Sequence, residues 1–132
     1  FLIIHDWKRP WRITGNSSVY RFKLGAFPGL LPYFREHFDE IREKFRNEQA
    51  YLSWYVDQEK KLTYWPESWC KSYKYHCLQK IPMAFFKPPV KPEGAKIIIF
   101  HGEINPPDAV NGGGGKWYRY VLPSQWIKDA WQ

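Results

Sequence analysis

The pattern of apolar and polar positions predicts a long amphipathic helix in the first half of the chain. Its apolar residues recur at spacings of three and four, as they do on one face of an α-helix. They are Leu31, Phe34, Phe38, Ile41 and Phe45. Pro32 fits the first turn, where a missing N–H leaves no helical hydrogen bond unmade. Asn47 is expected to end this helix and to cap a second one that is rich in aromatic residues.

Four short stretches with strand-like patterns are bounded by Gly, Pro or polar turns. They are residues 1–6, 18–22, 62–65 and 96–100. The last is an unbroken apolar run after Lys96, which is typical of a strand buried on both faces. A short helix is expected at residues 126–131, and the prolines between positions 82 and 92 predict an extended linker.

Helices and strands are therefore mixed along the chain, and no internal repeat is evident. We predict an α/β fold, a mixed sheet with flanking helices, in a single domain that spans residues 1–132. The run Gly112–Gly115 is expected to act as a mobile hinge. It lacks the Lys-Ser/Thr pair of a phosphate-binding P-loop, so we exclude that motif.

Composition narrows the classes of function. The apolar runs of this 132-residue chain are far shorter than the ~18 residues that a membrane helix needs. No secretory signal pattern is present. Cys70 and Cys77 match neither a zinc-ribbon nor a redox spacing, so we expect two reduced, partly buried thiols. These features predict a cytoplasmic protein without a membrane span.

Charge and aromatic content favour ligands that carry phosphates or flat apolar faces. The net charge is +7, and aromatic residues make up 20% of the chain. Such a surface attracts phosphates, and exposed rings can stack on bases or sugars. A single-stranded nucleic-acid-binding module is therefore an alternative hypothesis. It ranks second, and nucleic acid is an unfavoured partner, because the sequence has no Lys/Arg stripe and no RNP-type aromatic motif.

Seven segments, taken in order, resemble the C-terminal half of GT-A-type glycosyltransferases, with the nearest likeness to bacterial proteins related to the glycogenin type. They are Ile4–Trp7, Asn16–Phe22, Asn47–Gln49, Trp65–Pro66, Ser72–Cys77, Lys96–Gly102 and Trp126–Trp131. The resemblance implies a partial GT-A-like mixed sheet that lacks the N-terminal nucleotide-binding half. It implies transfer of a sugar from a nucleotide-sugar donor to a glycan or other acceptor in polysaccharide biosynthesis.

The resemblance also implies roles for individual residues. The catalytic candidates are Glu48 and Gln49. The donor sugar would be bound by Asp6, Asn16 and Ser17. The diphosphate would be bound by Lys74, His101 and Gly102. Such enzymes use a divalent metal, Mn or Mg, to stabilise charge on the leaving diphosphate.

Two departures from the family pattern concern that metal. The Asp-x-Asp motif that holds it in similar enzymes lies in the nucleotide-binding half and does not occur in this chain. In glycogenin-type enzymes a His in a strand-end motif is a further ligand. Alignment on Gly102 puts Ile99 at that place and His101 at a variable one. A phosphate contact is therefore a better expectation for His101 than metal ligation.

Structural interpretations remain open beside these roles. Asp6 and Asn16–Ser18 have the residue types that form turns, and Glu48 suits the first turn of a helix. Lys74 also fits a solvated surface position. A third hypothesis is a catalytically inactive carbohydrate-recognition protein. In that case the opening strand, Phe1–Ile4, would expose a sheet edge and form a homodimer through it.

Overall fold

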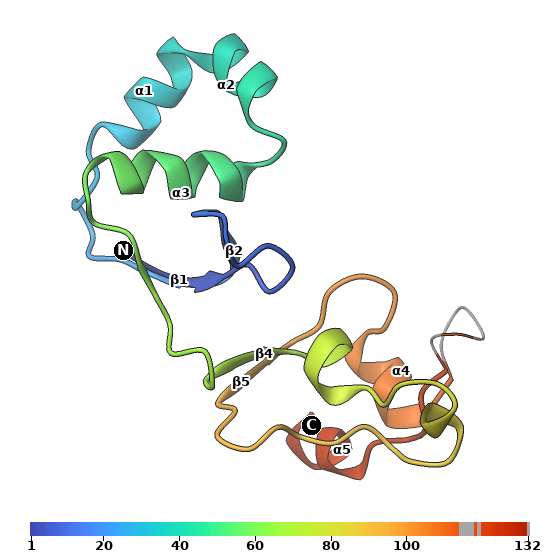
Figure 1. The fold of residues 1–132 in the computed structure, drawn as a ribbon. Coiled ribbons are helices and arrows are strands. Elements are labelled where there is room, and N and C mark those ends of the chain that lie inside the picture. The colour runs from blue at the N-terminus through green and yellow to red at the C-terminus, as the bar shows by residue number, and fades with distance from the viewer. Residues whose placement is uncertain (114–117, 119, 132) are drawn as a thin grey trace. The chain divides into compact units, whose positions relative to one another are not determined.

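The chain folds into two compact units in a computed structural model that describes residues 1–113, 118 and 120–131. Unit 1 spans Phe1–Glu67 and unit 2 spans Ser68–Gln132. Figure 1 shows unit 1 in blue to green and unit 2 in green to red, each with its own helices and strands. The α/β class is confirmed, with two small sheets. No helix in the described ranges is long and apolar enough to cross a bilayer.

Unit 1 contains a three-stranded mixed sheet in the order β2-β1-β3. Its strands are β1 (Leu2–His5), β2 (Gly15–Arg21) and β3 (Thr63–Tyr64). The pair β1/β2 is antiparallel and the pair β1/β3 is parallel. All three expected strands are confirmed, and β1 is the most buried because both of its faces and both of its edges are covered.

The expectation of an exposed edge at the opening strand is wrong. β1 is the central strand, hydrogen-bonded to β2 on one side and to β3 on the other. Ile3 and Ile4 are 0% and 2% exposed, respectively. Leu2 and Ile3 are paired on both sides, so this part of the strand offers no free edge to a second chain, and the homodimer predicted through Phe1–Ile4 loses its structural basis.

The long helix expected over the Leu31–Phe45 stripe is interrupted. The structure has α1 (Leu30–Glu36) and α2 (Phe38–Lys44). His37 lies between them with φ −110° and ψ 29°, outside the helical region. The break buries Ile41 and places the Phe45 ring 5.2 Å from that of Trp54 on the next helix. Packing against that helix thus overrides the continuous helical pattern.

The second helix, α3 (Glu48–Gln58), begins where the sequence predicts. The side chain of Asn47 accepts a hydrogen bond from the Ala50 N–H at 3.1 Å, as an N-cap does. Figure 1 shows α3 between the sheet and the α1–α2 pair. On one side Tyr51 donates to the Leu30 carbonyl at 3.0 Å, and on the other the buried Ser53 contacts β2. α3 is therefore the central layer of unit 1.

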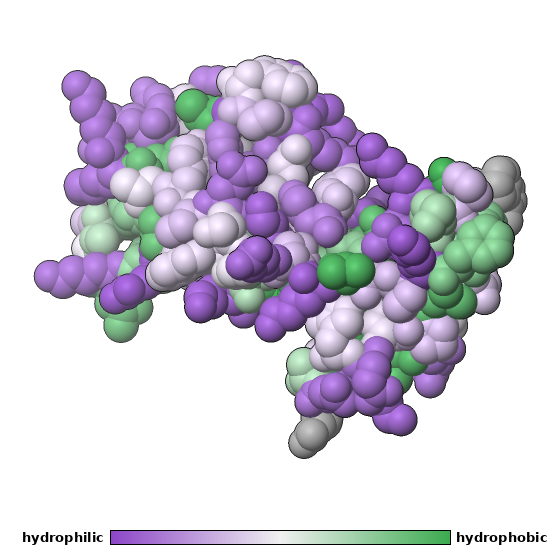
Figure 2. Space-filling model, turned by 60° about the horizontal axis from the view of Figure 1, so that its bottom comes forward, coloured by the Kyte–Doolittle hydropathy of each residue, from purple (hydrophilic) through white to green (hydrophobic). Residues whose placement is uncertain are grey.

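Aromatic rings stack at the surface along β2. The Tyr20 ring centre lies 5.7 Å from that of Phe1 and 5.9 Å from that of Phe22. Tyr20 and Phe22 are each nearly half exposed. On the face drawn in Figure 2, hydrophobic residues in green likewise interrupt a mainly hydrophilic surface in purple. Part of the aromatic content of this chain is therefore available to a ligand.

Gly15 is required by a close approach between β1 and β2. A Cβ added at this position would lie 2.6 Å from Cγ2 of Ile3. Because Ile3 is completely buried, its side chain has no space to move into. We expect Gly15→Ala to lower the free energy of unfolding by about 1–3 kcal/mol, as overpacked cores do. Urea denaturation would measure the loss. Ser18→Ala, on the exposed side of the same strand, is the matched control and should change stability by less than about 0.5 kcal/mol.

Unit 2 contains a two-stranded parallel sheet, β4 (Cys70–Ser72) and β5 (Ile97–Ile99). The helices of this unit that the structure describes are short: the π-helix η1 (Tyr73–Cys77), the 3-10 helix η2 (Met83–Phe85), α4 (Pro106–Asn111) and α5 (Gln125–Ala130). The expected closing helix is confirmed as α5, and η2 lies in the segment that was predicted to be a linker. Of the predicted glycine hinge, Gly114 and Gly115 lie outside the described residues.

Two predictions about burial in unit 2 have different outcomes. The expectation that the apolar run at 96–100 is buried on both faces is wrong, because Ile97 is 37% exposed and only Ile99 of the three strand residues is buried. A two-stranded sheet leaves faces and edges uncovered. Cys70 and Cys77 are both free thiols, as predicted, and both are buried.

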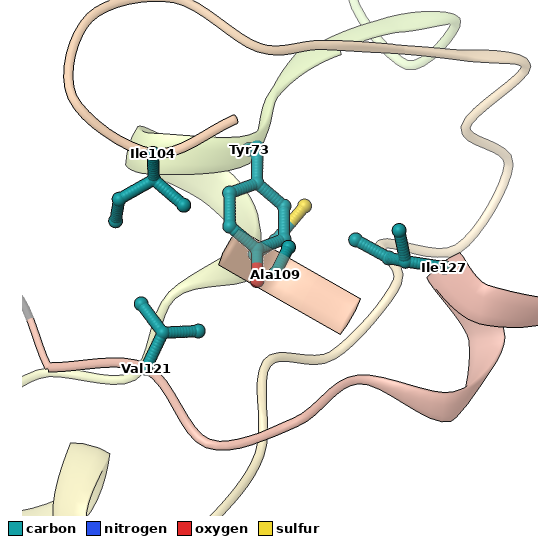
Figure 3. Packing of buried hydrophobic residues seen from close by; sticks show 6 residues of the cluster. Tyr73, Ile104, Ala109, Val121 and Ile127 are labelled. Atoms are coloured by element: carbon teal, nitrogen blue, oxygen red, sulfur yellow. The ribbon is translucent and has the colours of Figure 1, made fainter. Parts of the chain in front are cut away.

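Tyr73 lies at the centre of the unit 2 core. Figure 3 shows its ring among Ile104, Val121 and Ile127, with Ala109 beneath it. The side chain is 1% exposed, and its ring stacks on Phe100 with centres 4.6 Å apart. Its hydroxyl is hydrogen-bonded to the buried Ser124 Oγ at 3.3 Å. One aromatic side chain thus joins β5, α4 and the segment that leads into α5.

Burial of this core makes stability sensitive to alkaline pH. Desolvation raises the pKa of Tyr73 to about 12, although the Ser124 hydrogen bond opposes the shift. Desolvation also raises the pKa of Cys77 to about 12. In the unfolded chain both groups lose their protons at their ordinary, lower pKa values. Above about pH 9 the unfolded state therefore binds fewer protons than the folded state, and stability must fall as pH rises.

We accordingly expect the free energy of unfolding to be constant from about pH 7 to 8.5 and to decrease between about pH 9 and 12. Urea denaturation at several pH values measures it. The double variant Tyr73→Phe/Cys77→Ala removes both groups and should show a flatter decline than the unmodified chain. An unchanged slope in that variant would contradict the assignment.

Candidate functional site

Apart from Asp6, the residues that were given roles by the resemblance fall into two groups, one within each unit, together with some neighbouring side chains. In unit 1, Asn16 and Ser17 on β2 lie beside Glu48 and Gln49 on α3. We call these four residues the strand–helix cluster. In unit 2, the group consists of Ser72, Lys74, Tyr75, His101 and Gly102, which we call the histidine cluster.

A bulge in β2 exposes the strand side of the first cluster. Ile3 pairs with Tyr20, whereas the next residue, Ile4, pairs with Asn16. Residues 17–19 therefore bend out of the ladder, which turns their backbone and side chains away from β1. The Asn16 side chain stabilises the bend, because its Oδ1 accepts the Ser18 N–H at 2.9 Å. This bond agrees with the turn-forming interpretation of Asn16 and leaves its amide NH₂ as a donor.

Ser17 joins the bulge to the first turn of α3. Its hydroxyl donates to Glu48 Oε1 at 3.0 Å. Its backbone N–H donates to Gln49 Oε1 at 3.2 Å. Glu48 is an exposed side chain in the first helical turn, where the helix dipole favours a negative charge. The result is a carboxylate held by a neutral hydroxyl at the surface, with acceptor capacity remaining for further donors.

A buried serine fixes the geometry of this cluster. The Ser53 hydroxyl accepts the Gly15 N–H at 2.8 Å and donates to the Gln49 carbonyl at 2.7 Å. Ser53 is 0% exposed, so these bonds are shielded from water. Ser53 therefore joins the start of β2 to the start of α3 on their buried side. This fixes the relative positions of the polar residues of the cluster at the surface.

Asp6 takes the turn-forming position that was one of its two interpretations. Its Oδ1 accepts the Lys8 N–H at 2.9 Å, and its carbonyl accepts the Arg9 N–H at 3.2 Å. It follows β1 at the end of the sheet where β2 begins, because His5 pairs with Gly15. Its carboxylate thus lies at the same end of the sheet as the strand–helix cluster.

The histidine cluster lies at the carboxyl ends of two parallel strands. Ser72 ends β4, and its partner in the ladder, Ile99, ends β5 two residues before His101. The Ser72 hydroxyl and His101 Nε2 are hydrogen-bonded at 2.7 Å. In open α/β sheets the carboxyl ends of the strands are where ligands bind. This small sheet therefore places its polar residues where that rule predicts.

The π-helix η1 begins at the same serine. Ser72 Oγ accepts the Tyr75 N–H at 3.3 Å, and the Ser72 N–H donates to His76 Nδ1 at 3.0 Å. The Tyr75 ring lies 5.3 Å from the His101 ring, between centres. His101 is therefore held on two sides, by the hydroxyl of the last residue of β4 and by an aromatic ring of η1.

Gly102 leaves space for an approach to this histidine. Its φ is +85°, which favours glycine. A Cβ at this position would lie 4.0 Å from Lys74 Nζ, so the ammonium group is next to open backbone. Lys74 supplies an ammonium group beside the His101 segment, and the glycine lets a ligand approach its main chain closely. Such a group of donors suits phosphate oxygens.

The described residues do not provide a metal site of the usual kind. No three His, Cys, Asp or Glu side chains among them are grouped so that they could hold a metal ion. Nε2 of His101 is bonded to Ser72, which agrees with a role other than metal ligation. The Mn or Mg that the resemblance implies thus does not fit these residues alone.

Two positioning residues were missed by sequence reasoning. Ser53 belongs to no sequence motif, and it lies in a helix whose many aromatic residues indicate a core position. Ser72 lies within a matched segment but was given no role. The signal that could have found Ser72 is its position just before a helix. A serine there typically acts as an N-cap, because its hydroxyl accepts the backbone N–H three residues later, here that of Tyr75.

Comparison of the chain with protein-family models, with curated proteins and with solved structures found no match. Function is therefore inferred from the geometry of the two clusters and from the chemistry that their residues can perform.

Proposed function

We propose that this chain is the acceptor-side part of a sugar-transfer enzyme of the GT-A type, which moves a sugar from a nucleotide-sugar donor to a glycan or other acceptor. The observation that carries the proposal is the strand–helix cluster. It combines a neutral serine hydroxyl, an amide side chain and one surface carboxylate, held by the buried Ser53. Neutral hydrogen-bonding groups suit sugar hydroxyls, and a carboxylate suits an acceptor hydroxyl that must lose its proton.

In the proposed mechanism each cluster has a separate task. Asn16 and Ser17 bind hydroxyls of the donor sugar, and Asp6 adds an acceptor at the same end of the sheet. Glu48 accepts a hydrogen bond from the attacking acceptor hydroxyl or stabilises positive charge near the anomeric carbon, while Gln49 holds the strand side in place. In unit 2, taken by itself, Lys74, His101 and Gly102 are proposed to bind a diphosphate, because Lys74 and His101 can stabilise its negative charge.

The metal and the cellular setting are part of the same proposal. A divalent cation, Mn or Mg, would neutralise the diphosphate when bound, with ligands from outside the residues described above. Polysaccharide biosynthesis in the cytoplasm, where nucleotide sugars are made, is the proposed setting. Whether this chain acts by itself or joined to a nucleotide-binding half that carries Asp-x-Asp is decided by experiment.

The test is calorimetric titration with Mn²⁺ and a panel of UDP-, GDP-, CMP- and dTDP-sugars. It is run on the chain and on a version extended upstream in its reading frame. We expect one donor class to bind to the extended protein and to be slowly hydrolysed. The matching nucleoside monophosphate is the control and should bind more weakly. If neither protein binds or hydrolyses any nucleotide sugar, the proposal is wrong.

A second candidate function, binding of single-stranded nucleic acid, is supported by the stacked rings of Phe1, Tyr20 and Phe22 together with the net charge of +7. It predicts that oligonucleotide affinity falls steeply as salt rises. Measurement at 50 and 200 mM salt separates the two functions. Absent or salt-independent binding would reject this candidate.

A further inference from the structure

A pocket lies within unit 2, formed by β5, α5 and the loop that precedes β5. Its volume is about 440 Å³, which is within the usual size range of small-ligand sites. Its lining includes three aromatic rings and three charged side chains: Phe100, Trp126, Trp131, Lys91, Lys96 and Asp129. We call it the tryptophan pocket. The roles above do not use any of these six residues.

The walls of this pocket are fixed by hydrogen bonds. Trp126 Nε1 donates to the Pro89 carbonyl at 3.0 Å, which ties α5 to the loop that carries Lys91. The N–H of Lys96 donates to the Trp69 carbonyl at 2.9 Å, which ties the start of β5 to the chain before β4. Ile127, which is 3% exposed, holds α5 on the core. The pocket is therefore preformed on both sides.

Its chemistry combines three features that fit one class of ligand. Trp131 is 60% exposed, so the pocket has an accessible ring face on which an apolar sugar face can stack. Lys91 and Lys96 supply two positive charges that suit a carboxylate or phosphate. Asp129 accepts a hydrogen bond from Gln125 Nε2 at 2.8 Å and retains capacity for hydroxyl donors.

We propose that the tryptophan pocket binds an anionic saccharide, a sugar unit that carries a carboxylate or a phosphate. The two lysines pair with the anion, the tryptophan rings cover the sugar, and Asp129 accepts its hydroxyls. The carboxylate of Asp129 also disfavours a strand of nucleic acid, because it would repel the phosphates that repeat along such a strand. The binding site stands on this geometry alone. Its use as a subsite for an acidic glycan acceptor rests on the proposed function.

The experiment is calorimetric titration of the chain with four probes of similar length. They are a tetrasaccharide with two glucuronates, its carboxyl-reduced neutral analogue, a phosphorylated tetrasaccharide, and single-stranded oligothymidylate. We expect at least one acidic saccharide to bind about tenfold more tightly than the neutral one. Which acid binds better identifies the anion.

Variants locate the binding. Lys91→Gln/Lys96→Gln should reduce the preference for the acidic saccharide to less than about threefold. Trp131→Ala should weaken both saccharides about tenfold. Lys87→Gln/Lys128→Gln, exposed in the same unit but not lining the pocket, and Trp11→Ala, 77% exposed in unit 1, are the matched controls and should change nothing.

Three results would overturn the inference. The first is equal affinity for acidic and neutral saccharides, and the second is no saccharide binding. The third is binding of oligothymidylate that is as tight as binding of the acidic saccharide and depends as strongly on Lys91 and Lys96. The failure is separable from that of the proposed function, because Lys91→Gln/Lys96→Gln leaves the two clusters intact. Nucleotide-sugar binding without acidic-saccharide binding removes only this inference. Acidic-saccharide binding without nucleotide-sugar binding rejects only the proposed transferase function.

Discussion

Glu48→Gln is expected to lower kcat for sugar transfer by about 100-fold or more, with little change in KM for the donor. The substitution keeps the size of the side chain and its ability to accept from Ser17, but it removes the negative charge that the proposed mechanism uses. Positioned acid–base groups typically contribute about 10²- to 10⁴-fold. Initial rates with saturating donor and acceptor, in the version of the protein that shows transfer, measure the effect.

Two comparisons make this result specific. Glu43→Gln changes an exposed glutamate on α2 and should leave kcat unchanged. Thermal unfolding separates catalysis from folding, because loss of a first-turn acid costs the helix only about 0.3–1 kcal/mol. If Glu48→Gln keeps full activity, the carboxylate serves only the helix terminus, and the catalytic role is wrong.

Tyr73→Ala is expected to cost about 3–5 kcal/mol of folding stability, the range for truncating a large buried aromatic side chain. The ring is 1% exposed and contacts the core residues of unit 2 shown in Figure 3. Small domains are stable by about 5–15 kcal/mol in total, so this one change removes a large share. Urea denaturation followed by near-UV circular dichroism would measure it.

Tyr73→Phe is the matched control for that change. It keeps the ring and its stacking on Phe100 but deletes the hydroxyl bonded to Ser124. The expected cost is about 0.5–1.5 kcal/mol for one hydrogen bond. Equal losses in the two variants would show that the hydroxyl, rather than the packed ring, is what the core requires.

Local signals predicted most of the elements. The first strand, the Asn47 cap and the closing helix follow from residues near in sequence, and the structure has them where they are expected. Such features depend on turn chemistry and side-chain periodicity. They can be inferred without knowledge of what lies across the core.

Features that depend on packing could not be predicted in this way. The break at His37 follows from how α2 packs on α3, and the partial exposure of Ile97 follows from the two-stranded sheet that the described residues of unit 2 form. The central position of β1 depends on pairing with Thr63–Tyr64, about 60 residues away. The spacing pattern of a single segment does not contain these distant partners.

For the candidate site, the sequence supplied the residue types and the structure supplies their grouping within each unit. Ser17, Glu48 and Gln49 meet because a bulge turns residues 17–19 out of the ladder and Ser53 ties the two elements together. Neither the bulge in β2 nor the pair of Ser53 hydrogen bonds is marked by a sequence motif. The pairing of Ser72 with His101 likewise needs the parallel register of β4 and β5.

Chemical-shift mapping on the ¹⁵N-labelled protein is the most direct test of the central claim, that these polar clusters bind a nucleotide sugar. The ligand is the donor selected by calorimetry, added with Mn²⁺, and its nucleoside is the control. For each cluster taken separately, we predict that the largest shifts in unit 1 fall on the amides of Ser17 and Gln49, and that the largest shifts in unit 2 fall on those of Lys74 and Gly102. Shifts confined to the ring stack around Tyr20, or no saturable shifts with any donor, would contradict the account.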